Sequence, residues 1–416
     1  MTEPKFASPS EPVRIEGPVR VLLLENIHTS ASEMLQAEGF TVERAPKALK
    51  PDELREALKG VHMLGIRSKT NVVESVLADA PDLLAVGAFC IGTNQIDLVA
   101  GNANGIPVFN APFSNTRSVA ELVIAEMVML VRQIPDRSRE VHQGQWRKVS
   151  TGSHEVRGKT VGIVGYGHIG SQVGVLAESL GMRVLFYDIA TKLPLGNVRS
   201  TATLEELLGA SDFVTLHVPA TPQTEWMIGA EQIARMKKGA MLLNLSRGTV
   251  VDIPALAAAL RSGHLGGAAV DVYPQEPESN SDGFKSELQS LTNVILTPHI
   301  GGSTEEAQES IGREVATSLI KFVRYGVTTG SVNFPQVEMP PSPHTHRILN
   351  VHRNVPGVLR DINKIVSDLN ANIHAQVLAT DPHIGYLLMD LDQDVSDPVA
   401  RAIAALKTDI KTRVVS

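Results

Sequence analysis

One stretch of the chain, Thr160–Asp188, limits the possible folds more than any other. It starts with the apolar run Val161–Val164 and continues with three glycines spaced as Gly-x-Gly-x-x-Gly. A segment with helical spacing, Gln172–Leu180, and a second apolar run, Val184–Tyr187, follow before the final residue, Asp188. Strand, glycine turn, helix, strand and terminal acid in this order predict a βαβ unit that binds a dinucleotide. We call this stretch the fingerprint.

The glycines and the acid each have a separate role in such a unit. Gly165 allows the tight turn, Gly167 lets the backbone approach a pyrophosphate, and Gly170 lets the helix pack closely on the strand. The N-terminus of the helix, where its dipole is positive, then faces the phosphates. Asp188 is placed to accept hydrogen bonds from both hydroxyls of the adenosine ribose and to repel a 2′-phosphate. The fingerprint therefore predicts NAD, and not NADP, as the cofactor.

Length and charge limit the remaining possibilities. With 416 residues the chain is long enough for two or three domains, and its net charge of −7 argues against nucleic acid or an acidic membrane surface as a partner. No apolar run is long enough to span a bilayer. Residues 1–18 lack the basic start and apolar core of a signal peptide and are expected to be a flexible arm. The single cysteine, Cys90, excludes an internal disulfide framework and favours the cytoplasm.

Short strands and helices alternate on both sides of the fingerprint. Residues 19–114 predict a first α/β lobe that is complete before Thr160. After the fingerprint, polar residues recur at the ends of apolar strands, namely His217, Ser246, Asp271 and His299. In an open parallel sheet the ligand crevice lies at these strand ends, so we expect the functional site there.

Two long helices and a proline-rich segment mark the expected domain boundaries. Asn115–Arg132 is apolar on most faces, which suits a crossover between domains or a subunit interface. Ser303–Arg324 is a helix long enough to return to the first lobe, and Gln336–Pro343 predicts a stiff linker. Beyond the linker the elements follow the order βαββαβ, which is ferredoxin-like. Trp146 is either an interface anchor or an ordinary packing residue.

Arg247, Glu276 and His299 form a constellation with a shared chemistry. Hydride transfer between NAD and a carbon that bears a hydroxyl requires a group that exchanges the hydroxyl proton, and histidine does this near neutral pH. A carboxylate such as that of Glu276 would orient the imidazole and raise its pKa. An arginine binds a 2-hydroxy or 2-oxo carboxylate with two parallel hydrogen bonds. Taken singly, an arginine or a glutamate is usually a solvated surface residue and a histidine is more often structural, so their motif context decides.

That context resembles a known family. The chain is similar to the D-isomer-specific 2-hydroxyacid dehydrogenases in the segments NLSRGTVVD, DVYPQEP, LTPHIGGST, GYGHIGSQVG and NAPFSNTRSVAELVIAEM, and the likeness runs from about Val19 to the end. It is strongest to members in which a regulatory ACT domain follows the core directly. The resemblance implies an α/β fold with a Rossmann-type NAD domain inserted in a flavodoxin-like substrate domain, plus a ferredoxin-like ACT domain. The implied limits are 1–18 for the arm, 19–114 and 307–335 for the substrate-binding domain, 115–306 for the NAD-binding domain, 336–344 for the linker and 345–416 for the ACT domain.

The resemblance also implies roles for individual residues. His299 would be the proton donor or acceptor, Glu276 its partner and Arg247 the carboxylate-binding group. The implied cofactor-binding residues are Gly165, Gly167, His168, Ile169, Gly170, Asp188, His217, Ser246, Arg247, Asp271, His299, Gly301 and Gly302. The implied substrate-binding residues are Arg67, Ser68, Lys69 and Asn115, whose basic and polar groups suit a phosphorylated substrate. No metal site is implied.

The implied reaction is the NAD-dependent oxidation of 3-phosphoglycerate to 3-phosphohydroxypyruvate, the first step of L-serine synthesis. The ACT domain implies feedback inhibition by L-serine, with His352, Asn354 and Asn372 as effector-binding residues. A homo-oligomer is expected, and a two-fold core contact combined with tail-to-tail sheet pairing would give a tetramer. Two alternatives stay open. One is a dehydrogenase of another 2-hydroxy acid, such as glycerate or 2-hydroxyglutarate, and the other is an NAD-sensing interaction protein on the same fold.

Overall fold

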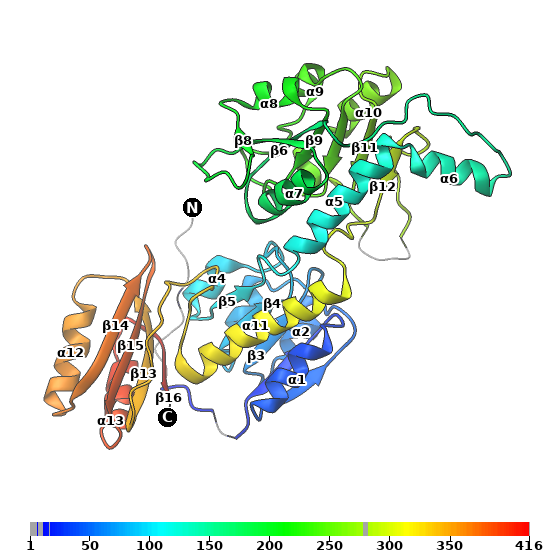
Figure 1. Cartoon of the computed structure of the whole chain (residues 1–416). Helices are drawn as coiled ribbons and strands as arrows, with labels where there is room; N and C mark the ends of the chain where they lie inside the picture. Colours follow the sequence, from blue (N-terminus) through cyan, green and yellow to red (C-terminus); the bar gives the residue numbers. More distant parts are fainter. Residues whose placement is uncertain (1–5, 7–10, 16, 278–281, 416) are drawn as a thin grey trace. The chain divides into compact units, whose positions relative to one another are not determined.

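The computed structural model describes residue 6 and residues 11–15, 17–277 and 282–415. These residues form two compact units, one made of Met1–Ser114 with Gln308–Ser416 and the other of Asn115–Ala307 (Figure 1). The expected N-terminal arm, residues 1–18, lies partly outside the described residues. Each unit has its own sheets and its own hydrophobic cores. None of the helices in the described ranges is both long and apolar enough to cross a membrane.

The first unit begins with a five-stranded parallel sheet in the order β2-β1-β3-β4-β5. Its strands are β1 (Arg20–Leu23), β2 (Thr41–Arg44), β3 (Met63–Ile66), β4 (Ala85–Ala88) and β5 (Val108–Asn110). The associated helices are α1 (Thr29–Ala37), α2 (Pro51–Ala57), α3 (Glu74–Ala78), α4 (Leu98–Ala103) and α11 (Glu305–Tyr325). Strands β3 and β4 are buried along their whole length, as parallel strands with both faces covered must be. The strand order is flavodoxin-like, which confirms the prediction for this lobe.

The same unit ends in a four-stranded antiparallel sheet in the order β14-β15-β13-β16. Its elements are β13 (Thr345–Arg353), α12 (Val358–Asp368), β14 (Ile373–Thr380), β15 (Ile384–Asp392), α13 (Ser396–Ala404) and β16 (Asp409–Val415), which confirms the predicted βαββαβ order. The two helices cover one face, where Ile348, Ile362 and Ile403 share a core. The opposite face contributes Leu349 and Tyr386 to the core of the first lobe.

The proline-rich segment before β13 is packed against the protein. Met339 is 5% exposed and belongs to the core that the lobe shares with the antiparallel sheet. Arg347 holds the segment from β13, donating to the Asp390 carboxylate over 2.7 and 2.9 Å and to the carbonyl oxygens of Tyr325, Met339 and Pro340. These bonds use all the N–H donors of a guanidinium group. The proline-rich segment is therefore fixed to the first lobe and to the antiparallel sheet.

Part of the expected arm is also attached. The backbone N–H of Val13 donates to the carbonyl of Thr412 on β16 over 2.7 Å, and Arg14 pairs with Asp397 over 3.0 Å. Residues 11–15 therefore lie along the edge of the antiparallel sheet.

The second unit is built on a seven-stranded parallel sheet in the order β12-β11-β10-β9-β6-β7-β8. Its strands are β6 (Thr160–Val164), β7 (Arg183–Tyr187), β8 (Arg199–Ser200), β9 (Phe213–Leu216), β10 (Met241–Asn244), β11 (Gly267–Val270) and β12 (Val294–Leu296). Its helices are α5 (Thr116–Val131), α6 (Ile134–His142), α7 (His168–Ser179), α8 (Leu204–Ala210), α9 (Ala230–Arg235), the 3-10 turn η1 (Gly248–Val250) and α10 (Ile253–Arg261). The order changes direction beside β6, as in a Rossmann fold, so this part of the fold prediction is also confirmed.

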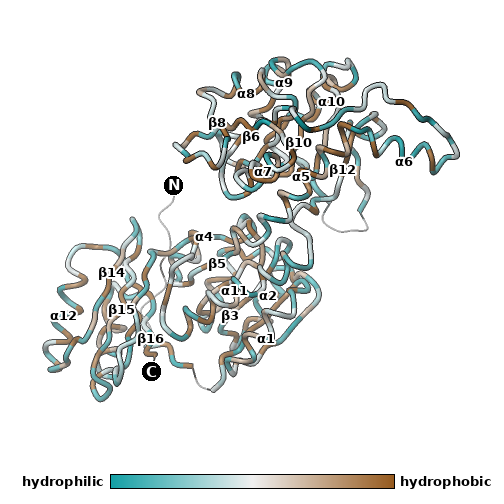
Figure 2. The backbone as a smooth tube through the Cα atoms, in the orientation of Figure 1, coloured by the Kyte–Doolittle hydropathy of each residue, from teal (hydrophilic) through white to brown (hydrophobic). Residues whose placement is uncertain are grey.

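Helices α5 and α6, which follow each other in the chain, differ in character. Helix α5 matches the predicted apolar helix and shares a core with α7 through Val123 and Val173. Helix α6 was not predicted, and its residues are largely hydrophilic (Figure 2). Trp146 follows α6 and is 83% exposed, so its interpretation as an ordinary packing residue is wrong.

Candidate active site and cofactor site

The glycine turn of the fingerprint has the geometry that a pyrophosphate site needs. Gly165 has a φ of +90°, and a Cβ atom there would lie 2.3 Å from the carbonyl oxygen of His217. A Cβ on Gly170 would lie 2.2 Å from the carbonyl oxygen of Gly165, so helix α7 and the turn touch through backbone alone. Gly167 is the N-cap of α7, and a Cβ atom on it would have no protein atom within 4 Å. A bound phosphate can therefore reach the first N–H groups of the helix.

The acid at the end of β7 is held in place by two backbone bonds. One carboxylate oxygen of Asp188 accepts from the N–H of Tyr166 over 2.8 Å, and the other accepts from the N–H of Ala190 over 2.9 Å. Each oxygen keeps a second lone pair, which suits the two hydroxyls of an adenosine ribose. The predicted residues His168 and Ile169 are the first two residues of α7, directly after the glycine turn. His168 is exposed and Ile169 is half-buried.

His217 leaves a polar atom without a partner next to the same turn. Its Nε2 atom lies 2.9 Å from the hydroxyl of Thr215, whereas its Nδ1 atom is enclosed and has no hydrogen-bond partner among the described residues. Burial lowers the pKa of His217 to about 3, so the imidazole is neutral near pH 7. An unpaired buried atom beside a glycine turn is the kind of feature that a bound ligand completes. Turn, acid and histidine together fit NAD.

At the far strand ends, His299 and Glu276 form a hydrogen-bonded pair. The Nδ1 atom of His299 lies 2.8 Å from Oε2 of Glu276. This bond raises the pKa of His299, and burial opposes the rise without cancelling it. Burial alone would raise the pKa of Glu276, but the hydrogen bond and the charge of His299 outweigh it and leave that pKa lowered. A protonated Nδ1 facing the carboxylate leaves Nε2 free to exchange a proton.

The loop that carries His299 is organised by Asp271. His299 has a φ of +55°, a left-handed conformation that non-glycine residues seldom adopt. Asp271 is 1% exposed, and its carboxylate accepts from the N–H groups of Ile300 and Gly301, each over 2.8 Å, and from the hydroxyl of Thr297 over 2.6 Å. The predicted cofactor residue Asp271 therefore also fixes the backbone of the predicted catalytic histidine.

Arg247 stands on a turn that a buried amide holds. Asn244 is fully buried, accepts from the N–H and hydroxyl of Ser246 over 3.1 and 2.9 Å, and donates to the carbonyl of Arg247 over 3.0 Å. Sequence reasoning missed Asn244, although a polar residue at the end of apolar β10 was the available signal. Arg247 is near enough to influence the pKa values of both Glu276 and His299, so the structure brings the three predicted residues together.

Asn115 and Gly302 lie against each other near this loop. A Cβ atom on Gly302 would lie 2.2 Å from Nδ2 of Asn115, so the amide occupies the space that glycine leaves. The Oδ1 atom of Asn115 is buried without a hydrogen-bond partner among the described residues. The predicted substrate residue Asn115 therefore lies next to Gly302, one of the predicted cofactor-binding residues.

The other predicted substrate residues belong to the first unit. The backbone N–H groups of Arg67, Lys69 and Thr70 donate to the carboxylate of Glu25, which is 8% exposed. Arg67 is half-buried, Ser68 and Lys69 are exposed, and neither cation has a carboxylate within 4.0 Å in the described chain. Glu25 was missed, and its signal was an acid two residues after the apolar strand β1, which ends at Leu23. The side chains of Arg67 and Lys69 therefore carry two positive charges without an ion-pair partner in the described chain, above a backbone that the Glu25 carboxylate binds.

The predicted effector residues do not meet within one chain. His352 on β13 pairs with Gly385 on β15, and Asn354 follows in the next loop, where it donates to the carbonyl of Asp381. Asn372 precedes Ile373, which pairs with the other end of β15. About six residues of strand, roughly 20 Å, separate the two ends.

Known proteins similar to this chain agree with the fold. Residues 124–301 match the D-isomer specific 2-hydroxyacid dehydrogenase, NAD binding domain, and residues 348–411 match the AHAS small subunit-like ACT domain. The D-3-phosphoglycerate dehydrogenase of Dictyostelium discoideum is 56% identical over 396 residues, which cover 95% of this chain and 97% of the relative. That of Haemophilus influenzae is 53% identical over 397 residues, with 95% and 97% covered.

A solved structure gives the same result. The D-lactate dehydrogenase from Aquifex aeolicus, complexed with NAD and lactic acid, is similar with a TM-score of 0.67 and 28% identity, covering 76% of this chain and 100% of that chain. The matched domain binds NAD, and the residues around the glycine turn fit this cofactor. The chain therefore belongs to the D-isomer specific 2-hydroxyacid dehydrogenase family.

Proposed function

We propose that the chain oxidises 3-phosphoglycerate to 3-phosphohydroxypyruvate with NAD, the first step of L-serine synthesis. The observation that carries the proposal is the His299–Glu276 pair beside Arg247, on an NAD-binding domain. The relatives that cover nearly the whole chain are D-3-phosphoglycerate dehydrogenases, which supports this substrate over other 2-hydroxy acids. A catalytic set of this kind also argues against a purely NAD-sensing protein.

In this proposal each residue acts on one part of the substrate. His299 accepts the proton of the C2 hydroxyl at Nε2, because its Nδ1–H is committed to Glu276. Glu276 stabilises the imidazolium that forms. Arg247 binds the substrate carboxylate, and Asn115 contributes a polar group at the same site. NAD, when bound, supplies the hydride acceptor, and the fingerprint residues orient it.

The loop of Arg67, Ser68 and Lys69 binds the substrate phosphate in this proposal. Its support is the unpaired positive charge of Arg67 and Lys69 on a backbone that Glu25 holds. A phosphate dianion would be bound by both cations. An unphosphorylated 2-hydroxy acid would gain nothing from them.

Initial rates with purified protein test the reaction. We expect kcat/KM for 3-phosphoglycerate to exceed that for glycerate or 2-hydroxyglutarate by at least about a hundredfold. His299→Ala should abolish most turnover and keep NADH binding, whereas His154→Ala, at an exposed position of the same unit, should behave like the wild type. A higher kcat/KM for an unphosphorylated acid would contradict the proposed substrate.

We further propose that L-serine inhibits the enzyme at a site on the ACT domain formed by His352, Asn354 and Asn372. Because Asn372 lies at the other end of the sheet from His352, the site needs Asn372 of a second copy. Strand β14 pairs only with β15 within the described chain, so its outer edge is open to such a copy. An initial-rate assay with millimolar L-serine tests this, and an unchanged rate would contradict it.

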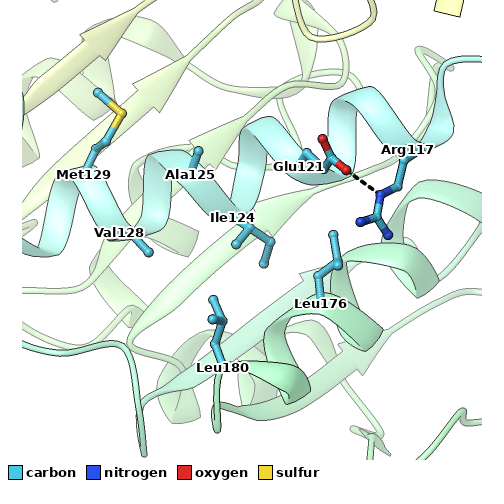
Figure 3. Close-up of a pocket in the computed structure, with 8 residues that line it drawn as sticks. All are labelled: Arg117, Glu121, Ile124, Ala125, Val128, Met129, Leu176 and Leu180. Carbon is cyan, nitrogen blue, oxygen red and sulfur yellow. Dashed lines mark hydrogen bonds and ion pairs between the residues drawn. The ribbon is translucent and has the colours of Figure 1, made fainter. Parts of the chain in front are cut away.

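A tetramer with a second, core contact completes the proposal. Its support is an apolar groove on α5 and α7, into which Ile124, Val128, Leu176 and Leu180 point (Figure 3). Exposed apolar grooves of this kind commonly bind other protein surfaces, and exposed Trp146 is an anchor of suitable size.

Light scattering of the eluted protein tests the assembly. The wild type should have the mass of four chains, and Trp146→Ala should shift it toward two. Trp226→Ala is the matched control, since Trp226 is 45% exposed elsewhere in the same unit.

We also propose the domain limits given by the sequence and, from the lone Cys90, a cytoplasmic location.

A further inference from the structure

A network of buried polar groups lies directly behind His352. The Nδ1 atom of His352 is 2.8 Å from Oδ1 of Asn350, two residues earlier on β13. The amide nitrogen of Asn350 donates to Oδ1 of Asp409 over 2.7 Å and to the hydroxyl of Thr412 over 2.9 Å, both on β16. That hydroxyl donates in turn to Asp409 over 2.7 Å. Each of the four residues is at least 96% buried, with exposures of 0% for Asn350, 1% for Thr412, 2% for Asp409 and 4% for His352.

The direction of every bond in this network follows from its end at Asp409. Oδ1 of Asp409 accepts from both neighbours, whereas Oδ2 has no partner in the described chain, so the proton that burial favours by raising the pKa of Asp409 to about 7 belongs on Oδ2. The Asn350 amide must therefore present its nitrogen to Oδ1 on β16. A flipped amide would place its oxygen against the carboxylate, which repels it. The Asn350 oxygen therefore faces His352 and can only accept, so the proton of the imidazole must be on Nδ1.

The other nitrogen of His352, Nε2, is consequently unprotonated and can only accept a hydrogen bond. Nε2 has no hydrogen-bond partner in the described chain. It is also not among the fully enclosed polar atoms without a partner, so the atom is not completely sealed by the protein. It occupies the space that Gly385 leaves, since a Cβ atom on Gly385 would lie 2.2 Å from it. Burial lowers the pKa of His352 to about 4, so the ring stays neutral at physiological pH.

We propose that Asn350, supported by Asp409 and Thr412, is a positioning residue of the effector site that holds His352 in the tautomer with an unprotonated Nε2. The effector group that meets His352 is then a hydrogen-bond donor, an ammonium or a hydroxyl, and not a carboxylate. This inference rests on the proposed role of His352 in effector binding. It assigns a specificity function to residues that do not themselves touch the ligand.

Inhibition assays on the full chain test the positioning role, with each variant normalised to its own rate without serine. Asn350→Leu removes the acceptor and should raise the L-serine concentration for half-inhibition by at least about tenfold. Asp409→Asn keeps an oxygen that can accept the same two bonds, and it should retain inhibition within about threefold. Asn363→Leu, at an exposed position on α12, is the matched control and should be inhibited like the wild type.

Effector analogues identify the donor group. O-methyl-L-serine keeps the ammonium group and loses the hydroxyl donor. Full inhibition by it assigns the ammonium to His352, and lost inhibition assigns the hydroxyl. If L-serine inhibits the Asn350→Leu variant by half at the same concentration as the wild type, the proposal is overturned.

The tautomer itself can be observed without any variant of the network. Solid-state NMR of histidine-labelled full-length protein, with His352→Gln used to assign the signals, should show a protonated Nδ1 and an unprotonated Nε2 at His352. A protonated Nε2 would overturn the inference even if serine inhibits normally. Absence of serine inhibition in the wild type would instead contradict the proposed effector, while the nitrogen signals would still report the tautomer.

Discussion

At the scale of single residues, the hydrogen bond between His299 and Glu276 decides which imidazole nitrogen can act. Their 2.8 Å contact occupies Nδ1, and the raised pKa of His299 makes the ring a stronger base than a free histidine. In the proposed oxidation His299 must be neutral to accept a proton, so we expect activity to rise as pH increases through its pKa. The reverse reaction needs the protonated ring and has the opposite dependence.

Replacing the partner should shift this pH dependence in a predictable direction. In Glu276→Gln the main cause of the raised pKa is gone, so the acidic limb of the kcat/KM profile for oxidation should move to lower pH. The maximal kcat should fall by roughly tenfold to a hundredfold, because the imidazole loses its orientation. Glu287→Gln, at an exposed carboxylate of the same unit, is the control. A limb that stays at the wild-type pH would contradict this role for Glu276.

Asp271 is a second residue whose effect can be measured separately. Asp271→Asn would place an amide N–H₂ against backbone N–H groups, so the loop of His299 should lose about 1–3 kcal/mol of stabilisation. We expect a lower Tm by thermal unfolding and a lower kcat. Thr297→Val removes only one of the three bonds and should have a smaller effect on both. Equal effects of the two variants would show that the backbone bonds do not matter.

At the scale of elements, the packing of α7 on β6 explains why two fingerprint glycines are needed for different reasons. Gly170 meets the backbone of Gly165 whether or not a ligand is bound. Gly167 meets nothing in the protein, so only a ligand can require its missing side chain. Folding and binding should therefore separate between the two positions.

Alanine variants at these positions test the separation. Gly170→Ala should lower both the Tm and NADH affinity, because the helix must move away from a contact of 2.2 Å. Gly167→Ala should keep the wild-type Tm within about 2 °C and weaken NADH binding by at least about tenfold. Thermal unfolding and NADH fluorescence titration provide the two measurements. Tight NADH binding by Gly167→Ala would exclude the pyrophosphate from this turn.

At the scale of the whole molecule, Arg347 joins the ACT sheet to the first lobe through one buried side chain. It is 5% exposed, and its partner Asp390 is 1% exposed. The same guanidinium binds carbonyls at the end of α11 and in the segment before β13. Removing it would take the guanidinium donors from three carbonyl oxygens and would leave the buried Asp390 carboxylate with Ser342, whose backbone N–H donates over 3.3 Å, in place of its charged partner.

We expect Arg347→Met to lower the free energy of unfolding by about 3–5 kcal/mol. The double variant Arg347→Met/Asp390→Leu removes the orphaned charge as well and should recover much of this loss. Urea unfolding of the two variants and of Asp390→Leu alone gives the coupling between the residues. Losses that simply add would show that the ion pair is not the joining element.

The sequence by itself determined the fold class and the cofactor, and it supplied the residues of the proposed catalytic set. Local signals sufficed for this, because a glycine turn, an alternation of strands and helices, and polar residues at strand ends are properties of neighbouring positions. The βαββαβ tail and the helix α5 were predictable on the same ground. Helix α6 was not, because its residues are largely hydrophilic and none of them is buried.

Only the tertiary structure decided how these residues are held. Glu25 lies 42 residues before Arg67, Asn350 lies 59 residues before Asp409, and Asp271 meets a loop 29 residues later, so no local pattern connects them. Such bonds form because buried polar groups need partners that the fold, and not the adjacent chain, supplies. The fingerprint could indicate that NAD binds, whereas the orientation of His299 and the tautomer of His352 follow from contacts between segments that are distant in the sequence.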